Sequence, residues 1–425
     1  MKAVFTIVAK NYIGLAEVLG QSVRKYSDAD FYIVVADEFS QDDPIKKQLN
    51  DNVLIAKDIL NIKNQVWNEL SFKYNLVEFC TSIKASSFQY FLNEKKYDKV
   101  IFTDPDVYFF NSMELIFSEL DQHSILLTPH ILELQENFKG DYPDFLFLVN
   151  GTFNLGFLGL SAGESTQRFL KWWNNRLFQS CFFDFEKGMA TDQKWINMIP
   201  SFFSPKELKI SFNRGMNVAP WNFHERKIIE ANGLLSVTQR GNNNDDIVPL
   251  MFVHFSGFDY NSIIEGRADH KNEKSSSFSD YNIVFDKYAE GLKNNSFSQY
   301  IKLKYSYNYY NNGNQILSLH RRIYRRILQE GKFFVDPFEI KSGSFYEQLS
   351  KKKLLDHSRI AADKITNKNI KGFDKKIGYV NFVFTIIKSL IGIKRYSIMI
   401  RFFRRYFSEE NQVFLYDKEL GKKIW

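Results

Sequence analysis

The 425-residue sequence contains only two cysteines, Cys80 and Cys181. Two cysteines cannot build the multi-bridge framework of a small secreted protein, and they cannot supply a cluster of metal-binding thiolates. With 44% hydrophobic residues, the chain is instead rich enough in apolar side chains to bury a large core. We therefore expect a protein that folds in a reducing compartment.

Long apolar runs are also missing. A spanning helix needs about 20 mostly apolar residues, and residues 378–393, which come closest, are shorter and contain Lys388. The N-terminal stretch MKAVFTIVAKNY has a short apolar run with no small-residue cleavage pattern after it. We expect neither a spanning helix nor a secretory signal, and predict a cytoplasmic location.

A net excess of positive charge is missing outside the C-terminal tail. The chain has a net charge of +7, but residues 375–408 alone contribute eight Lys or Arg and no acid, so the rest sums to −1. A nucleic-acid-binding domain carries its basic residues on the folded core, so no nucleic-acid partner is expected. If helical, the tail is typical of interfacial helices on anionic membranes, which would make the protein peripheral on the inner face. The alternative is a packed helical extension with solvated charges.

Short apolar strands alternate with helical patterns in the first third of the chain. The expected strands are 3–9, 30–37, 52–56 and 98–104, and the expected helices are 15–23 and 74–93. Further on, we expect strands at 124–130, 152–161 and 251–257, and a helix at 161–177. This order predicts an α/β fold with a mixed, mainly parallel sheet flanked by helices.

Two carboxylates stand where one of these strands ends. Asp104 and Asp106 flank Pro105 directly after the apolar run of 98–103. Ligands of open α/β sheets bind at the carboxyl ends of the strands, and Mg²⁺ binds through one or two carboxylates plus substrate phosphates. The pair therefore predicts a cation site for a diphosphate ester, with a solvated turn as the alternative.

The segment FTDPDVYFF resembles the DXD motif of nucleotide-sugar glycosyltransferases with the Rossmann-like GT-A fold. Over about residues 3–260, five more motifs are similar in order to those of the retaining transferases of family eight. They are Asn11-Tyr12 after strand one, Lys84 on the helix before the DXD strand, Asn154 and Gly156, Asp192-Gln193, and His254 with Gly257. The second half also resembles bacterial surface-polysaccharide transferases, through Asn154–Phe157, Trp172-Trp173, Cys181–Asp184, Asp192–Trp195 and Asn217–Asn222.

The resemblance implies a function and a role for each matched residue. It implies transfer of a hexosyl group, with retention, from a nucleotide-diphosphate sugar, a UDP-sugar being favoured, to a glycan or lipid-linked hydroxyl. Asp104, Asp106 and His254 would bind Mn²⁺ or Mg²⁺. The donor nucleotide would contact Thr6, Ala9, Asn11, Tyr12, Lys84, Asp104, Asp106 and Gly257, and the catalytic residues would be Asn154, Asp192 and Gln193.

Two departures from the family pattern keep alternatives open. Ala9 stands where the family has an acidic residue near the base, and Tyr260 stands where it has a lysine for the diphosphate. Lys84 or Arg267 could supply the missing charge. Two alternatives remain. The protein could be an inverting enzyme with Asp192 as base, or it could be a non-catalytic protein that binds a glycan or a nucleotide. Nucleotidyl transfer is disfavoured because no glycine-rich basic loop follows the first strand.

Individual residues also have structural alternatives. His254 could be a core histidine, Asn154 could satisfy a strand bend, and Asp192 could cap a helix. Trp221 is the best candidate for stacking on a sugar ring.

The extent of the resemblance, together with shifts in composition after it, suggests a division of the chain. We predict a nucleotide-sugar and metal-binding catalytic domain at 1–260, a polar, partly mobile connector at 261–300, and a basic, aromatic, largely helical extension at 301–425. The turn-rich stretches 241–246 and 261–280 are the expected mobile parts.

Overall fold

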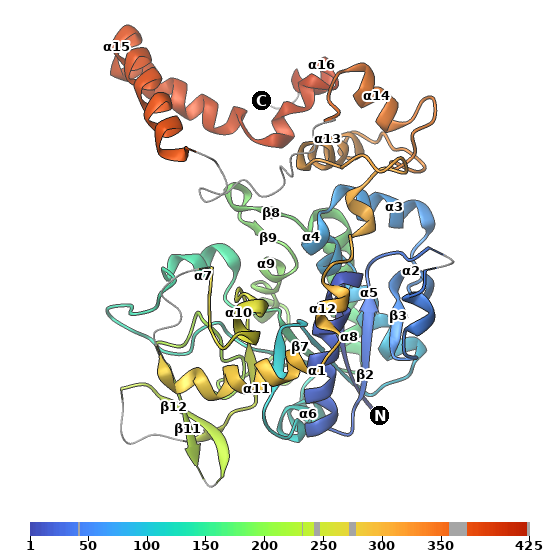
Figure 1. The fold of residues 1–425 in the computed structure, drawn as a ribbon, viewed down its shortest axis with the longest axis vertical. Coiled ribbons are helices and arrows are strands. Elements are labelled where there is room, and N and C mark those ends of the chain that lie inside the picture. Colours follow the sequence, from blue (N-terminus) through green and yellow to red (C-terminus); the bar gives the residue numbers. More distant parts are fainter. Residues whose placement is uncertain (41–42, 232, 242–246, 272–277, 357–371, 423–425) are drawn as a thin grey trace. The chain divides into compact units, whose positions relative to one another are not determined.

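The computed structural model describes residues 1–425 except 41–42, 232, 242–246, 272–277, 357–371 and 423–425 (Figure 1). It divides into two compact units. Unit 1 comprises Met1–Ile62 and Leu76–Ser306, and unit 2 comprises Lys63–Asn75 and Tyr307–Trp425. Most of the stretch 241–246 and part of 261–280 lie outside the described residues.

A seven-stranded sheet with the order β10-β6-β7-β4-β1-β2-β3 forms the centre of unit 1. Its strands are β1 (Lys2–Val8), β2 (Asp30–Val35), β3 (Val53–Ile55), β4 (Lys99–Thr103), β6 (Ile125–Leu127), β7 (Phe157–Ser161) and β10 (Leu208–Ile210). Strand β7 runs antiparallel to β4 and β6, while the other four pairs are parallel. The predicted mixed, mainly parallel sheet is confirmed.

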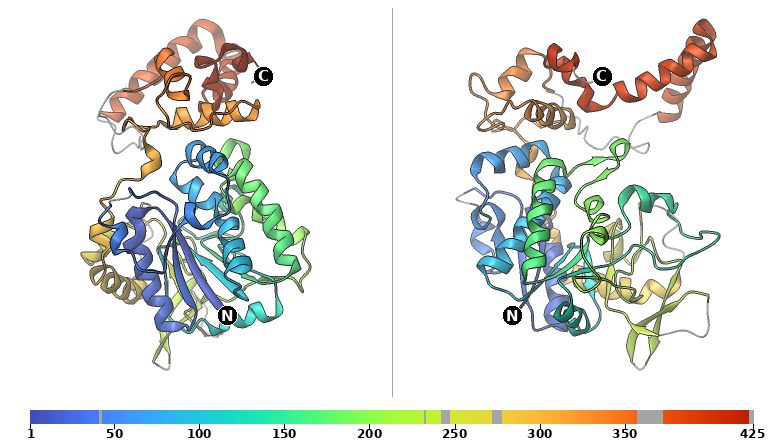
Figure 2. Two further views of the ribbon diagram at one scale, coloured as in Figure 1. Left: turned by 90° about the vertical axis from the view of Figure 1, so that its right-hand side faces the viewer. Right: turned by 180° about the vertical axis from the view of Figure 1, so that it is seen from behind.

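Helices cover both faces of this sheet (Figure 2). They are α1 (Ile13–Tyr26), α2 (Ala56–Ile59), α4 (Leu76–Ser82), α5 (Lys84–Gln89), α6 (Glu114–Gln122) and α8 (Glu164–Ser180). Helix α1 packs on the sheet because Leu15, Val18, Leu19 and Val23 recur at helical spacing and are fully buried. The helix predicted at 74–93 is instead α4, α5 and a π-helical turn at Tyr90–Glu94.

Smaller elements surround the carboxyl edge of the sheet. Strand β5 (Val107–Phe109) pairs with β14 (Phe252–His254), β8 (Phe183–Asp184) pairs with β9 (Met189–Ala190), and β11 (Arg226–Ala231), β12 (Leu234–Gln239) and β13 (Val248–Pro249) form a third sheet. The short helices here are α7 (Phe145–Asn150), α9 (Gln193–Ile196) and α10 (Tyr260–Ile264). The strand predicted at 152–161 begins only at Phe157, because residues 152–156 turn through the site described below.

The range predicted to be a connector contributes to the core of unit 1. Helices α11 (Asn282–Lys293) and α12 (Phe297–Tyr300) lie within it. Val284, Tyr288 and Leu292 of α11 are buried in the same apolar cluster as Val253 of β14. Their spacing of four residues places all three on one helix face, so this face completes the packing around β14.

Unit 2 is helical, as predicted for the C-terminal region. Its helices are α3 (Asn64–Lys73), α13 (Ser318–Gln329), α14 (Phe345–Lys351), α15 (Phe373–Tyr406) and α16 (Lys418–Lys422). The buried Arg321 guanidinium holds α13 against the end of α3 by donating to the carbonyls of Phe72 and Tyr74. Thus a segment far upstream in the sequence belongs to this helical unit.

Candidate active site

The two aspartates lie on a tight turn between β4 and β5. Asp104 directly follows β4, and its backbone N–H donates to the carbonyl of Gly156 at 2.9 Å. The N–H of Val107 donates to the carbonyl of Asp104 at 3.2 Å and closes the turn. Pro105 sets φ near −65° inside this turn, so both carboxylates can face the same side.

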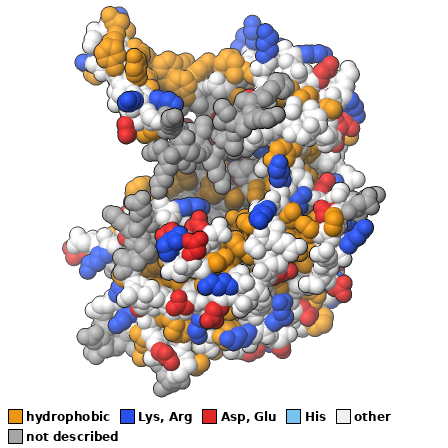
Figure 3. All heavy atoms as spheres, viewed as in Figure 1, with side chains coloured by type: hydrophobic (Ala, Val, Ile, Leu, Met, Phe, Trp, Pro, Cys, Tyr) orange, Lys and Arg blue, Asp and Glu red, His pale blue; other side chains and the backbone are white. Residues whose placement is uncertain are grey.

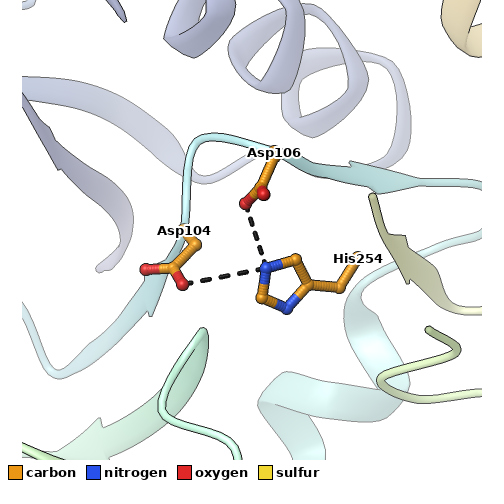
Figure 4. A group of neighbouring side chains, drawn as sticks. All are labelled: Asp104, Asp106 and His254. Carbon is orange, nitrogen blue, oxygen red and sulfur yellow. Dashed lines mark ion pairs between the residues drawn. The ribbon is translucent and has the colours of Figure 1, made fainter. Parts of the chain in front are cut away.

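The pairing of β14 with β5 brings His254 to this turn. His254 lies opposite Val107 in the antiparallel register, and the N–H of Phe255 donates to the carbonyl of Asp106 at 2.8 Å. The Nε2 atom of His254 is 3.0 Å from Asp106 Oδ1 and 3.8 Å from Asp104 Oδ2 (Figure 4). One potential ligand atom from each residue lies within 4.8 Å of the others.

Gly156 makes room for the imidazole. A Cβ atom at this position would lie 2.4 Å from His254 Cε1 and 2.8 Å from Asn154 Oδ1. Any larger residue would displace the ring, which gives a steric reason for a glycine in the predicted Asn-x-Gly motif.

Asn154 and His130 fix the orientation of that ring. Asn154 Oδ1 is 3.2 Å from His254 Nδ1, and Asn154 Nδ2 is 3.5 Å from His130 Nε2. The Nδ1 atom of His130 faces the carbonyl of Thr152 at 3.1 Å. If each Nδ1–H donates, His130 Nε2 accepts from Asn154, and His254 Nε2 is directed toward the two aspartates. Asn154 therefore does more than satisfy a strand bend, and His130 is a residue that sequence reasoning missed.

This arrangement predicts that Asn154 contributes to metal affinity. We expect Asn154→Leu, which keeps the approximate volume but removes the acceptor for His254 Nδ1–H, to weaken Mn²⁺ binding about 10- to 100-fold. Titration of free Mn²⁺ by electron paramagnetic resonance measures this, with the exposed Asn93→Leu as the matched control. An unchanged affinity for Asn154→Leu would mean that the amide does not orient the ligand nitrogen.

The three groups are electrostatically linked. Burial, opposed by the charges of Lys84 and His254, raises the pKa of Asp104 to about 6. Burial would also raise the pKa of Asp106, but the charge and hydrogen bond of His254 outweigh it and hold this pKa below its ordinary value. Burial would lower the pKa of His254, yet the charge of Asp106, with Asp104, raises it. A divalent cation can replace the His254 proton as the positive partner of both carboxylates.

The predicted nucleotide-contacting residues gather at the end of β1. Ala9 is buried and precedes the short 3₁₀ turn Lys10–Tyr12, whereas Thr6 is fully buried inside the strand. Asn11 Oδ1 is buried without a hydrogen-bond partner within the described part of the chain. Burial, with the negative charge of Asp106, raises the pKa of Tyr12. Asn11 and Tyr12 therefore lie in the neighbourhood of the aspartate turn.

Lys84, predicted to contact the donor nucleotide, forms a buried ion pair with Asp192. Its ammonium lies 2.5 Å from Asp192 Oδ2, donates to the carbonyl of Leu155 at 2.9 Å and lies 4.0 Å from the ring centre of Phe102. The side chains of Lys84 and Asp192 are only 2% and 3% exposed, so a diphosphate could reach Lys84 only after rearrangement.

Asp192 and Gln193 hold the loop that contains Asn154. Asp192 accepts from the hydroxyl of Thr191 at 3.0 Å as well as from Lys84, and its side chain makes no capping bond to α9. The capping alternative for Asp192 is therefore wrong. Gln193 accepts from the N–H of Leu155 at 3.0 Å and donates to the carbonyl of Asn150 at 3.1 Å.

Tyr260 occupies the position where the family pattern has a lysine. Its hydroxyl donates to Asp106 Oδ2 at 3.5 Å, and its ring makes an edge contact with Tyr12. The sequence marked this residue only as a departure, because nothing in its local pattern indicates a contact with Asp106 across 154 positions.

Besides Lys84, a second basic residue, Lys271, acts on the aspartates. Its charge helps to lower the pKa of Asp106, and its N–H donates to the carbonyl of Gly257 at 3.2 Å. Gly257 has φ of +83°, a conformation that favours glycine. Arg267, the other candidate from the sequence, instead forms exposed ion pairs with Glu265 and Asp269.

Trp221 lies between the two histidines. Its ring centre is 5.2 Å from that of His130 and 5.3 Å from that of His254. The indole Nε1 is buried and has no hydrogen-bond partner among the described residues. Because this N–H is buried, it could bond to a ligand oxygen only after a rearrangement that exposes it.

The donor set fits a divalent cation. Two carboxylate oxygens suit Mg²⁺ or Mn²⁺, and an added imidazole nitrogen suits Mn²⁺ somewhat better. The side chain of Asp104 is 36% exposed, against 15% for Asp106 and 4% for His254, so solvent and ligands reach the group from the side of Asp104.

No protein-family model matches the chain. Among curated proteins, it is similar to the uncharacterized protein YfnF of Bacillus subtilis (strain 168), with 24% identity over 289 residues that cover 68% of this chain and 90% of YfnF. The uncharacterized protein YfnD of the same organism is 27% identical over 187 residues, covering 43% of this chain and about half, 54%, of YfnD.

Solved structures show weak likeness. The galactosyltransferase LgtC with donor and acceptor sugar analogs gives a TM-score of 0.41 at 15% identity, covering 68% of this chain and 95% of LgtC. Mouse xyloside xylosyltransferase 1 gives 0.32 at 14%, covering 52% and 88%, and the mannosyltransferase Ktr4p of S. cerevisiae gives 0.31 at 13%, covering 49% and 68%. Because these TM-scores are below 0.5, the likeness carries no argument about function, and a functional proposal has to rest on the geometry of the site.

Proposed function

We propose that the protein is a metal-dependent glycosyltransferase that moves a hexosyl group from a nucleotide-diphosphate sugar to a hydroxyl of a glycan or lipid-linked acceptor. The convergence of Asp104, Asp106 and His254 at the carboxyl edge of the sheet carries this proposal. These residues come from segments about 150 positions apart, and each was expected to bind the cation from the resemblance described above. A cytoplasmic role in bacterial surface-polysaccharide assembly, with a UDP-sugar as donor, belongs to the same proposal.

The residues of the chain have separate tasks. Asp104, Asp106 and His254 Nε2 would hold Mn²⁺ or Mg²⁺, which when bound supplies positive charge against the departing diphosphate. Asn154 orients His254, and Tyr260 supports Asp106. Asn11 Oδ1 and Trp221 Nε1 are buried polar atoms without partners among the described residues, and they would bond to the donor or acceptor once a rearrangement exposes them.

The transfer breaks the bond between the anomeric carbon and the diphosphate oxygen and forms a bond from that carbon to the acceptor oxygen. The proton of the acceptor hydroxyl passes to the leaving diphosphate. Retention is favoured over inversion because Asp192 accepts from both Lys84 and Thr191. A carboxylate with both oxygens engaged and nearly buried is poorly placed to act as general base, and acts instead by holding Lys84, which also donates to the carbonyl of Leu155 beside Asn154.

A panel of nucleotide sugars tests this function. With Mn²⁺ present, we expect slow release of nucleoside diphosphate from at least one nucleotide sugar, and loss of that release when a chelator removes the cation. Nucleotide-sugar binding without release would instead favour the non-catalytic binding protein. Neither binding nor release across the panel would contradict the proposal.

A further inference from the structure

Helix α15 carries apolar side chains that the proposed function does not use. Its segment Phe373–Arg404 is long enough to cross a membrane, and the most apolar 18 residues within it have a mean hydropathy of 1.4 and are not buried. Large apolar residues are exposed along it: Ile377, Tyr379, Val380, Phe382, Val383, Ile386, Leu390, Ile393, Ile398 and Ile400. Figure 3 shows hydrophobic side chains gathered over this helix, at the upper left. So many exposed apolar groups indicate a surface that is covered by a partner.

A break at Gly392 divides the helix into two arms. Gly392 has φ of 76° and ψ of 157°, which are not helical values. The first arm, residues 373–391, and the second arm, residues 393–406, therefore have different directions. The apolar stretch of the first arm, residues 377–391, is about 22 Å long. This length is short of the hydrocarbon core of a bilayer, which is about 30 Å thick.

The first arm is suited to an apolar environment. Its polar residues Asn381, Thr385 and the charged Lys388 recur at spacings of four and three, so they share one side and leave the rest of the circumference of 377–391 largely apolar. The long Lys388 side chain can extend its ammonium to the headgroups while its stem stays among apolar groups. The Thr385 hydroxyl donates to the carbonyl of Asn381 at 2.8 Å, and the Ser389 hydroxyl donates to that of Thr385 at 2.9 Å. These hydroxyls therefore need no water when the arm leaves solvent.

The second arm has the pattern of an interfacial helix. Tyr396, Met399, Ile400 and Phe403 recur at i, i+3, i+4 and i+7, while Lys394 and the position seven residues later, Arg401, lie on another side. No acid occurs from residue 375 to residue 408, where eight Lys or Arg are present. This charge is complementary to anionic lipid headgroups.

After α15, the chain returns to helices that precede α15 in the sequence. After the helix, the 3₁₀ segment Glu409–Leu415 begins with Glu409, which accepts from Ser318 of α13 at 2.6 Å, and Tyr416 packs on Phe345 of α14. Helices α13 and α14 precede α15 in the chain. A single crossing by α15 would require the chain to cross back within residues 357–371. That stretch contains Arg359, Asp363, Lys364, Lys368 and Lys371, which do not suit the bilayer core.

From these observations we propose that α15 inserts into one leaflet of an anionic membrane without crossing it. The apolar stretch of the first arm, residues 377–391, lies among the acyl chains, and the basic second arm lies along the headgroups. Insertion does not depend on sugar transfer, so either proposal can fail without the other. The sequence predicted only peripheral membrane binding, and this proposal makes that binding a one-sided insertion. A helix can therefore have the apolar composition of a membrane-spanning helix without crossing the bilayer.

Co-sedimentation of the full chain with vesicles tests the binding. We expect about tenfold or stronger preference for phosphatidylcholine vesicles that contain phosphatidylglycerol over pure phosphatidylcholine vesicles. Ile386→Asp combined with Leu390→Asp should abolish this binding, while Leu115→Asp, at an exposed position of α6 in unit 1, should leave it unchanged. Equal binding to both vesicle types, or unaltered binding by the double variant, would overturn the proposal.

Labelling by a membrane-impermeant maleimide tests the topology on preformed anionic vesicles. Variants with one introduced cysteine, at Asp374, Leu390 or Lys418, report the two flanks and the first arm, because all three positions are exposed in the free protein. Burial raises the pKa of the Cys80 thiol to about 12 and that of Cys181 above its ordinary value, so a brief pulse labels the introduced thiols first.

We expect Asp374→Cys and Lys418→Cys to be labelled from outside and Leu390→Cys to be protected only when vesicles are present. Protection of one flank would reveal a crossing helix and contradict one-sided insertion. Labelling of Leu390→Cys on vesicles as fast as in solution would show that the arm does not enter the bilayer.

Discussion

Asp106→Asn is expected to lower turnover of the nucleotide sugar by about 10²- to 10³-fold, as loss of a group that stabilises a developing charge does. Asp106 lies 3.0 Å from His254 Nε2 and also accepts from Tyr260, so it is the more connected of the two carboxylates. The amide keeps the shape of the side chain but cannot provide the negative charge that a divalent cation needs.

The matched control is Asp286→Asn, an exposed position on α11 outside the cation site. We expect this control to retain full turnover, and both variants to keep the far-ultraviolet circular dichroism of the wild-type protein. Turnover by Asp106→Asn at the wild-type rate, in a folded protein, would refute the assignment of this carboxylate as a metal ligand.

The buried pair of Lys84 and Asp192 is expected to produce the largest effect on stability. Lys84→Met leaves the Asp192 carboxylate charged and almost completely buried, which should reduce the free energy of unfolding by about 3–5 kcal/mol. The double variant Lys84→Met with Asp192→Leu removes both charges and should recover most of the loss. Denaturant unfolding of the two single variants and the double variant measures the coupling.

An exposed ion pair gives the control for this cycle. Arg267 and Glu265 are 58% and 57% exposed, so Arg267→Met should change stability by no more than about 1 kcal/mol. A loss for Lys84→Met no larger than for Arg267→Met would mean that the buried pair is not formed. If the double variant regains stability but not turnover, Asp192 has a role in the reaction beyond the pairing.

The sequence could predict the parts of the fold that depend on local pattern. Apolar strands such as 98–104 and the helical spacing of Leu15, Val18 and Val23 follow from side-chain periodicity alone, and the structure agrees with them. The strand predicted at 152–161 is too long at its start, because the chain bends into the site at Asn154 and Gly156. Such a bend accommodates a distant histidine and leaves no signal in local periodicity.

Most contacts between distant segments could not be predicted from the sequence. The resemblance suggested His254 as a partner of Asp104 and Asp106, but not that Asn154 sets its orientation or that His130 lies behind Asn154. For Lys84, the resemblance suggested a contact with the donor nucleotide, but the structure buries this residue in an ion pair with Asp192. Composition and spacing do not predict this pairing across 108 positions. The break in α15 at Gly392 is seen only in its backbone angles, and the hydropathy of the sequence does not predict it.

The coordination of Mn²⁺ by His254 can be measured directly by pulsed electron paramagnetic resonance of the protein with Mn²⁺ and a nucleoside diphosphate, comparing the wild type with His254→Gln. We expect the coupling of one directly bound histidine nitrogen to the manganese in the wild type, and its disappearance in the variant. A wild-type spectrum without nitrogen coupling, or the same coupling in His254→Gln, would show that the imidazole is not part of the cation site.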